Sequence, residues 1–171
     1  MQVPDAKLVP STRSARDLGA ISPAPMRIYS YRHVVGFGDT NLVGNVYFVN
    51  HIEWQGRCRE MFLREKAPEV VQGFAQGLAL VTTRCSCEYL SELMVFDEVR
   101  VDMRLDGIRE NRIAFDFEYW RCNGDGPDEL IALGHQEVAC LRNSGTFRMP
   151  GEVPSALLAA LQPYQNACPI R

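Results

Sequence analysis

The sequence lacks the motifs that carry much of the common chemistry of enzymes. Its 171 residues contain no Gly-x-Ser-x-Gly elbow for a serine nucleophile, no His-Glu-x-x-His zinc motif and no glycine-rich phosphate loop of the Walker type. The three histidines, His33, His51 and His135, form no recognisable motif. Serine hydrolases with a nucleophile elbow, zinc peptidases of this type and P-loop nucleotide hydrolases are therefore excluded.

Long apolar runs and basic runs are also missing. No apolar stretch reaches the roughly 20 residues that span a bilayer, and the N-terminus lacks the charged start and apolar core of a signal peptide. The net charge of -3 and the absence of a basic cluster do not suit binding to nucleic-acid phosphates. We therefore expect a cytoplasmic protein without a membrane span and without a nucleic-acid partner.

The six cysteines include no Cys-x-x-Cys pair. They are scattered through apolar or strand-like segments, which is typical of reduced thiols. Cys85 and Cys87 would share one face of a strand, with no clustered histidines to complete a metal site. The sequence thus predicts neither a metal site nor an organic cofactor.

Length and composition predict one globular domain. With 171 residues, of which 46% are hydrophobic, the chain is long enough for one substantial core and leaves little room for a second. Residues 1–26 hold several prolines and serines without periodicity, so we expect a flexible N-terminal extension there. We place the domain at 27–143 and assign 144–171 to a C-terminal tail with a short helix at 155–161.

Hydrophobic periodicity predicts an α+β fold. A β-rich run from Ile28 to Phe37 precedes a turn, and a proline-free helical pattern follows from about Val46 to Lys66. After a short linking segment, four stretches alternate apolar and polar residues as half-buried strands do: 81–89, 99–105, 113–119 and 130–141. Turn-forming residues at 106–111 and 123–127 predict hairpins. This order fits an antiparallel sheet wrapped around one long central helix.

The predicted helix carries one anomaly. At about 100° per residue, one narrow stripe collects the side chains that should face the core: Phe48, Ile52, Gln55, Arg59 and Phe62. Arg59 is always protonated in proteins, so it brings a permanent charge to this face. Two explanations stay open, a part in chemistry or an ion pair with a carboxylate at a subunit interface.

The residues around this helix resemble a known family. Three phrases are distinctive: Asp-Thr-Asn-Leu-Val-Gly-Asn-Val-Tyr at 39–47, Trp-Gln-Gly-Arg-Cys-Arg-Glu at 54–60 and Cys-Glu-Tyr-Leu-Ser-Glu-Leu at 87–93. They resemble the hotdog-fold thioesterases, and more closely the thioesterases of enediyne polyketide biosynthesis, the group of the calicheamicin and dynemicin pathways. The resemblance covers about residues 27–143.

The resemblance implies a hotdog fold and a homotetramer, built as a dimer of dimers with active sites between subunits. The implied reaction is hydrolytic release of a polyene or β-keto polyene chain from the acyl-carrier domain of an iterative polyketide synthase. A β-keto acid released in this way can then lose CO2. Two alternatives stay open: a general acyl-CoA thioesterase, and a non-catalytic subunit that binds an acyl chain.

The resemblance also assigns catalysis to Asn41 and Arg59. An amide cannot act as a base near neutral pH, so Asn41 would orient the thioester carbonyl or a water. Arg59 would supply positive charge where the tetrahedral intermediate becomes negative, helped by backbone N–H groups at Gly44 and Asn45 near the helix start. By residue type alone, without the resemblance, a tight turn or a helix cap is the favoured explanation for Asn41.

Neighbouring residues receive supporting roles. Asp39 is expected to hold the turn by accepting hydrogen bonds from backbone N–H groups. Phe48, His51, Ile52 and Tyr89 are candidates to line the acyl channel, and core packing explains the apolar ones equally well. His51 stands where the resembling enzymes commonly have tyrosine, and a polar residue packed near the helix start also accounts for it.

Overall fold

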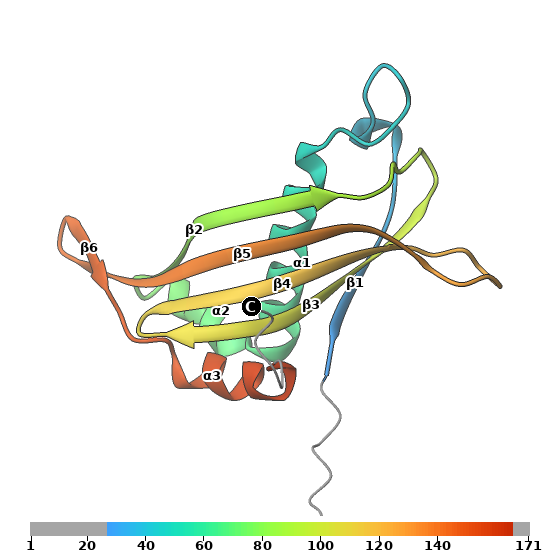
Figure 1. Ribbon diagram of the computed structural model, residues 1–171. Helices are drawn as coiled ribbons and strands as arrows, with labels where there is room; N and C mark the ends of the chain where they lie inside the picture. Colours follow the sequence, from blue (N-terminus) through green and yellow to red (C-terminus); the bar gives the residue numbers. More distant parts are fainter. Residues whose placement is uncertain (1–26, 166–171) are drawn as a thin grey trace, which may run out of the picture.

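The computed structural model describes residues 27–165, in which one curled sheet covers a long helix (Figure 1). The elements follow in this order: β1 (Tyr29–Val34), η1 (Phe37–Asp39), α1 (Val49–Lys66), α2 (Pro68–Phe74), β2 (Leu78–Tyr89), β3 (Glu98–Arg109), β4 (Arg112–Arg121), β5 (Glu129–Ser144), β6 (Phe147–Pro150), α3 (Ser155–Leu161) and η2 (Gln162–Tyr164). Among these helices, none is both long and apolar enough to cross a membrane. The extension predicted at 1–26 lies outside the described residues.

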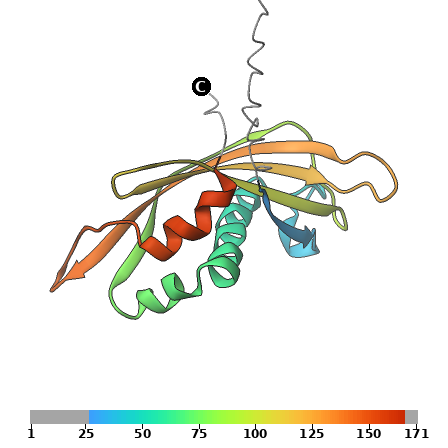
Figure 2. The same cartoon turned by 90° about the horizontal axis from the view of Figure 1, so that it is seen from below.

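The sheet is antiparallel in all its strand pairs. Its strand order is β1-β3-β4-β5-β2, with β6 paired to β5, so β1 and β2 form the two edges. The sheet arches over α1, and α2 and α3 lie on the same side of it (Figure 2). The expected antiparallel sheet around one long helix is therefore confirmed.

Alternation along the strands decides which side chains meet α1. Strands β3 and β4 bury every second residue toward the helix: Val99, Val101, Met103, Leu105, Ile113, Phe115, Phe117 and Tyr119. From α1, Trp54, Cys58 and Phe62 recur at four-residue spacing and are buried in the same core. Since each large apolar side chain contributes about 1.5–3 kcal/mol when fully buried, this layer is the main source of stability.

The long helix begins later than the sequence pattern predicts. α1 starts at Val49 rather than at about Val46. The N–H of Val46 donates to the carbonyl of Leu93 at 2.8 Å, and Asn45 forms an antiparallel bridge with Met94. These tertiary contacts hold residues 45 and 46 in bridges to the 93–94 segment, and they override the helical period of the side chains.

Two elements go beyond the sequence prediction. The linking segment after Ala67 is the helix α2, which has Pro68 in its first turn, where the missing N–H of proline costs nothing. The short strand β6 extends the sheet beside β5, so five strands follow α1 instead of four. Helix α3 lies where the tail helix is predicted, and its Leu157 and Leu161 are buried in the common core.

A substitution at Gly134 on β5 tests how closely α1 packs against the sheet. A Cβ at this position would lie 2.4 Å from Nε2 of Gln55 and 3.2 Å from the ring of Tyr119. Gln55 is fully buried, and its Nε2 donates to the carbonyl of Ser86 at 2.9 Å, so it moves aside only by losing that bond. We expect Gly134→Ala to lower the free energy of unfolding by about 1–3 kcal/mol, as measured by urea denaturation.

Gly107→Ala is the matched control for this substitution. Gly107 also lies in a strand, but a Cβ there meets nothing within 4 Å. It should change the free energy of unfolding by less than about 1 kcal/mol. Equal losses of stability in the two variants would contradict the close approach of α1 to β5.

Candidate active site

Asp39 ties the loop before α1 to the start of the helix. Its Oδ2 accepts a hydrogen bond from the N–H of Gly36 at 2.7 Å and lies 3.0 Å from Nε2 of His33. Its backbone carbonyl accepts from the N–H of Tyr47 at 2.8 Å and from Nδ2 of Asn50 at 2.6 Å. Both its side chain and its backbone are thus engaged in holding the turn.

Asn41 lies exposed on the same loop. Its Oδ1 accepts a hydrogen bond from the N–H of Val43 at 2.9 Å, which is a local turn that asparagine favours. Its backbone carbonyl accepts from the N–H of Gly44 at 3.0 Å, and the φ of 91° at Gly44 suits glycine. Since no hydrogen bond within residues 27–165 engages Nδ2 of Asn41, this group remains a donor for water or a ligand.

Gly44 and Asn45 do not stand at a helix start, which corrects the sequence prediction. Both precede Val49, the N–H of Gly44 is used within the turn, and Nδ2 of Asn45 donates to Glu92 at 2.9 Å. The prediction places them at the helix N-terminus because it extends the helical period back to Val46. In the structure they shape the loop that presents Asn41.

Large apolar side chains on this loop are exposed in the single chain. Leu42 is 107% exposed and Val43 is 77% exposed, and the paired rings of Tyr47 and Phe48 are about half exposed. The loop projects past the N-terminal end of α1 (Figure 1). Apolar residues gathered in this way mark an interaction surface.

Arg59 lies on the side of α1 that faces β2 and β5. Its Nη1 donates to Oε1 of Gln136 at 2.7 Å and to Oγ1 of Thr82 at 3.1 Å. The side chain is half-buried, and burial lowers the pKa of its guanidinium against the opposing effect of Glu60. Within residues 27–165, no carboxylate forms an ion pair with Arg59. The group therefore presents a partly desolvated positive charge that no carboxylate in this described part of the chain neutralises.

The single chain does not bring Asn41 and Arg59 together. Ten residues of helix separate Val49 from Arg59, which corresponds to about 15 Å of rise. Asn41 precedes Val49 in the sequence and belongs to the loop that projects past the N-terminal end of the helix. In one chain the two predicted catalytic residues are thus separated along the axis of α1 by at least this length of helix.

Three of the predicted channel residues lie together: Phe48, His51 and Tyr89. The His51 ring is buried and lies 5.1 Å from the ring of Tyr89 and 5.5 Å from that of Tyr119, centroid to centroid. The hydroxyl of Tyr89 donates to the carbonyl of Phe48 at 2.9 Å. Ile52 follows His51 in α1 and is half-buried.

The imidazole of His51 is unusual because it is polar, buried and unpaired. Neither ring nitrogen has a hydrogen-bond partner within residues 27–165. Burial lowers the pKa of His51, and the backbone of Phe48 opposes this shift without reversing it. His51 is therefore neutral near pH 7.

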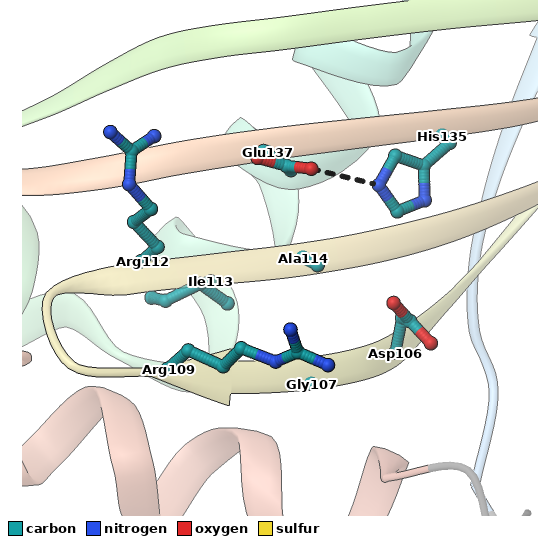
Figure 3. A pocket seen from close by; sticks show the side chains of 8 residues that line it. All are labelled: Asp106, Gly107, Arg109, Arg112, Ile113, Ala114, His135 and Glu137. Carbon is teal, nitrogen blue, oxygen red and sulfur yellow. Dashed lines mark ion pairs between the residues drawn. The ribbon is translucent and has the colours of Figure 1, made fainter. Parts of the chain in front are cut away.

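A separate polar pocket of about 420 Å³ lies on the other face of the sheet (Figure 3). Nδ1 of His135 lies 2.8 Å from Oδ1 of Asp116, and possible ligand atoms of Asp106, Asp116 and His135 all fall within 4.8 Å of one another. Histidine and carboxylates suit divalent cations, a possibility the sequence did not indicate because the three residues come from three strands. His135 and Gln136 point to opposite faces, so this pocket is separated from Arg59 by the sheet.

Comparisons with known proteins agree with the fold. The family model described as the thioesterase-like superfamily matches residues 35–161. The solved structure of the dynemicin thioesterase is 48% identical, covers 83% of this chain and 100% of its own, and superimposes with a TM-score of 0.79. A 1,4-dihydroxy-2-naphthoyl-CoA hydrolase of Thermosynechococcus vestitus is 26% identical over 143 residues, which cover 83% of this chain and 92% of that protein.

A more distant structure shows the same fold. The 4-hydroxybenzoyl-CoA thioesterase of Pseudomonas sp. is 17% identical, covers 78% of this chain and 99% of its own, and has a TM-score of 0.68. The resemblance to the enediyne thioesterases drawn from the motifs is confirmed by the match to the dynemicin enzyme. The chain therefore belongs to the thioesterase-like superfamily, a family of hotdog-fold acyl thioester hydrolases.

Proposed function

We propose that this protein hydrolyses the thioester that joins a polyene or β-keto polyene chain to the acyl-carrier domain of an iterative polyketide synthase in the cytoplasm. The observation that carries the proposal is the half-buried guanidinium of Arg59, which has no counter-ion within residues 27–165 and suits an oxyanion. The 48% identity to the dynemicin thioesterase supports this class of substrate. A β-keto acid product can lose CO2 after release.

The chemistry adds one water to the thioester and breaks one C–S bond. As water attacks the carbonyl carbon, the carbonyl oxygen becomes negative, and Arg59 stabilises it. Nδ2 of Asn41 holds the carbonyl or the water by hydrogen bonding, because an amide cannot take up the proton. The intermediate then expels the thiolate of the carrier, which takes the proton lost by the water, and a carboxylic acid is released.

The site is completed by a second copy of the chain. Asn41 and Arg59 are too far apart in one copy, and the loop that bears Asn41 exposes apolar side chains such as Leu42 and Val43. The outer edge of β2, next to Thr82, also lacks a strand partner within the described residues. We propose that Asn41 of one subunit meets Arg59 of another in a dimer, and that two dimers form the tetramer.

The acyl chain then runs beside the start of α1. Phe48 and Tyr89 expose apolar surface next to the buried ring of His51, and Ile52 lies half-buried on the same helix. A conjugated chain suits such an aromatic surface because flat π systems stack on one another. We propose this group as the wall of the acyl channel.

The test of this function is intact-protein mass spectrometry of a carrier domain loaded with a β-keto polyene chain. We expect the wild-type protein to return the carrier to its free thiol form, and to act on it faster than on saturated acyl-CoA. Equal rates would favour the general acyl-CoA thioesterase, whose case rests on the naphthoyl-CoA hydrolase relative. A carrier that stays loaded would favour the non-catalytic acyl-binding subunit.

Arg59→Met tests the charge on α1, because methionine keeps the length and packing of the side chain without the guanidinium. We expect kcat for thiol release to fall on the order of 100- to 1,000-fold. Two effects on the free energy of unfolding oppose each other, because the variant removes a partly desolvated charge but leaves the buried Oε1 of Gln136 without its donor. We therefore expect a net change of less than about 2 kcal/mol and a folded protein. Arg57→Met, on the solvent side of the same helix, is the control and should keep the wild-type rate. Loss of activity together with loss of fold would speak against a catalytic charge.

Asn41→Ala tests the donor on the loop. We expect kcat to fall at least about tenfold because Nδ2 is lost, and the free energy of unfolding to fall by about 1 kcal/mol because the turn bond to Val43 is lost. Asn123→Ala removes a comparable turn bond, from Nδ2 to the carbonyl of Pro127, and is the control. If both variants retain the wild-type rate, Asn41 serves only the turn.

His51→Phe tests the buried, neutral imidazole. Because burial lowers the pKa of His51, the unfolded chain binds a proton more readily than the folded one below about pH 6.5. This part of the stability is present above about pH 6.5 and is lost as the pH falls toward the lowered pKa. Urea denaturation should therefore show the variant gaining stability relative to the wild type between about pH 7.5 and about pH 5.5. A difference that does not change with pH would contradict the burial of a neutral His51.

A further inference from the structure

The two acceptors that hold Arg59 are both uncharged. Nη1 donates to Oε1 of Gln136 at 2.7 Å and to Oγ1 of Thr82 at 3.1 Å, and these bonds use both hydrogens of that nitrogen. Within residues 27–165, no hydrogen bond engages Nη2, and the buried Nε has no partner. The guanidinium is thus anchored at one nitrogen, while Nη2 stays available.

Gln136 is set in this place by the sheet. It is 3% exposed and is paired in register with Cys85 of β2 and Phe115 of β4. The register of β2 shifts between Thr82 and Arg84, so a bulge lies next to the second acceptor. Burying an amide on the helix-facing side of the sheet is unfavourable unless it is hydrogen-bonded. The bond from Arg59 satisfies Oε1 of Gln136.

The neighbouring carboxylates of Glu137 and Glu60 point away from the Arg59 guanidinium. Glu137 follows Gln136 in β5 and therefore points to the opposite face of the sheet. Glu60 follows Arg59 in α1, and its carboxylate lies 3.5 Å from Nη1 of Arg57 on the solvent side. A carboxylate in place of Gln136 would cancel the charge of the guanidinium, whereas a neutral oxygen orients it and leaves the charge intact.

We propose that Gln136 is a positioning residue for the thioesterase reaction: its neutral oxygen fixes the Arg59 guanidinium so that the full positive charge meets the oxyanion. Thr82 assists as the second neutral acceptor. The inference deepens the proposed function and rests on it. A purely structural role would not require a neutral side chain at position 136. A carboxylate accepts more strongly from arginine and would stabilise the fold as well or better.

Gln136→Glu separates the two roles, since glutamate has the same size and keeps the acceptor but adds a negative charge. In steady-state assays of carrier-bound and acyl-CoA thioesters, we expect kcat to fall on the order of 100-fold while KM changes less than about threefold. The melting temperature should not fall, because the bond to Arg59 becomes charge-assisted. A variant that keeps the wild-type kcat would overturn the proposal.

A second pair of variants places the same charge at the exposed acceptor, where folding is less at risk. Thr82→Asp should lose kcat on the order of 100-fold, as Gln136→Glu does, whereas Thr82→Asn, its neutral match, should lose at least about tenfold less than Thr82→Asp. Gln72→Glu adds a negative charge on the exposed surface of α2 and should keep the wild-type rate. Equal rates for Thr82→Asp and Thr82→Asn, or an equal loss in Gln72→Glu, would overturn the proposal.

The activity of the wild-type protein distinguishes failure of the proposed function from failure of the positioning role of Gln136. If the wild-type protein releases neither carrier-bound nor CoA-bound chains, the proposed function fails and the role of Gln136 falls with it. If the wild-type protein is active and the charged variants are equally active, only the positioning role fails.

Discussion

The structure depends on one constraint: the Arg59 guanidinium lies on the core-facing side of α1, and no carboxylate within residues 27–165 forms an ion pair with it. Burying a charge without an opposite charge is unfavourable, and the fold limits the penalty through two neutral acceptors, Gln136 and Thr82. The apolar layer of α1, β3 and β4 supplies the stability that tolerates such a site. In the proposed reaction, a stronger bond from Arg59 to a carboxylate would stabilise the chain but cancel the charge that the oxyanion needs, so stability and activity would oppose each other at this position.

Sequence patterns predicted the fold well and the site only in part. The alternation in β3 to β5 and the long helical stripe were visible because each follows a simple period. The start of α1 at Val49 was not, because bonds from residues 45 and 46 to the distant 93–94 segment override that period. Arg59 was conspicuous as a charge on an apolar stripe, whereas its partner Gln136 is one polar residue in a strand and becomes meaningful only when the sheet brings it opposite the helix. The Asp106, Asp116 and His135 cluster was hidden for the same reason.

The proposed sharing of the active site between two copies of the chain accounts for the remaining features of the loop before α1. The loop at 39–48 is firmly held by Asp39, and yet it presents Leu42 and Val43 to solvent and carries Asn41 away from Arg59. A rigid loop with exposed apolar tips is what a protein needs if it is to insert catalytic groups into a neighbouring copy. The polar pocket in Figure 3 lies across the sheet from this site, so the two faces of the sheet can serve different purposes.

Complementation between two inactive variants tests the shared site most directly. Arg59→Met and Asn41→Ala chains would be co-expressed with different tags, and mixed assemblies carrying both tags would be isolated and assayed for release of the acyl chain. If Asn41 of one subunit acts with Arg59 of another, one site of each mixed dimer holds both wild-type residues, and about half of the wild-type activity per dimer should return. If mixed assemblies are as inactive as each variant alone, Asn41 and Arg59 do not form one site between subunits, and the shared active site is contradicted.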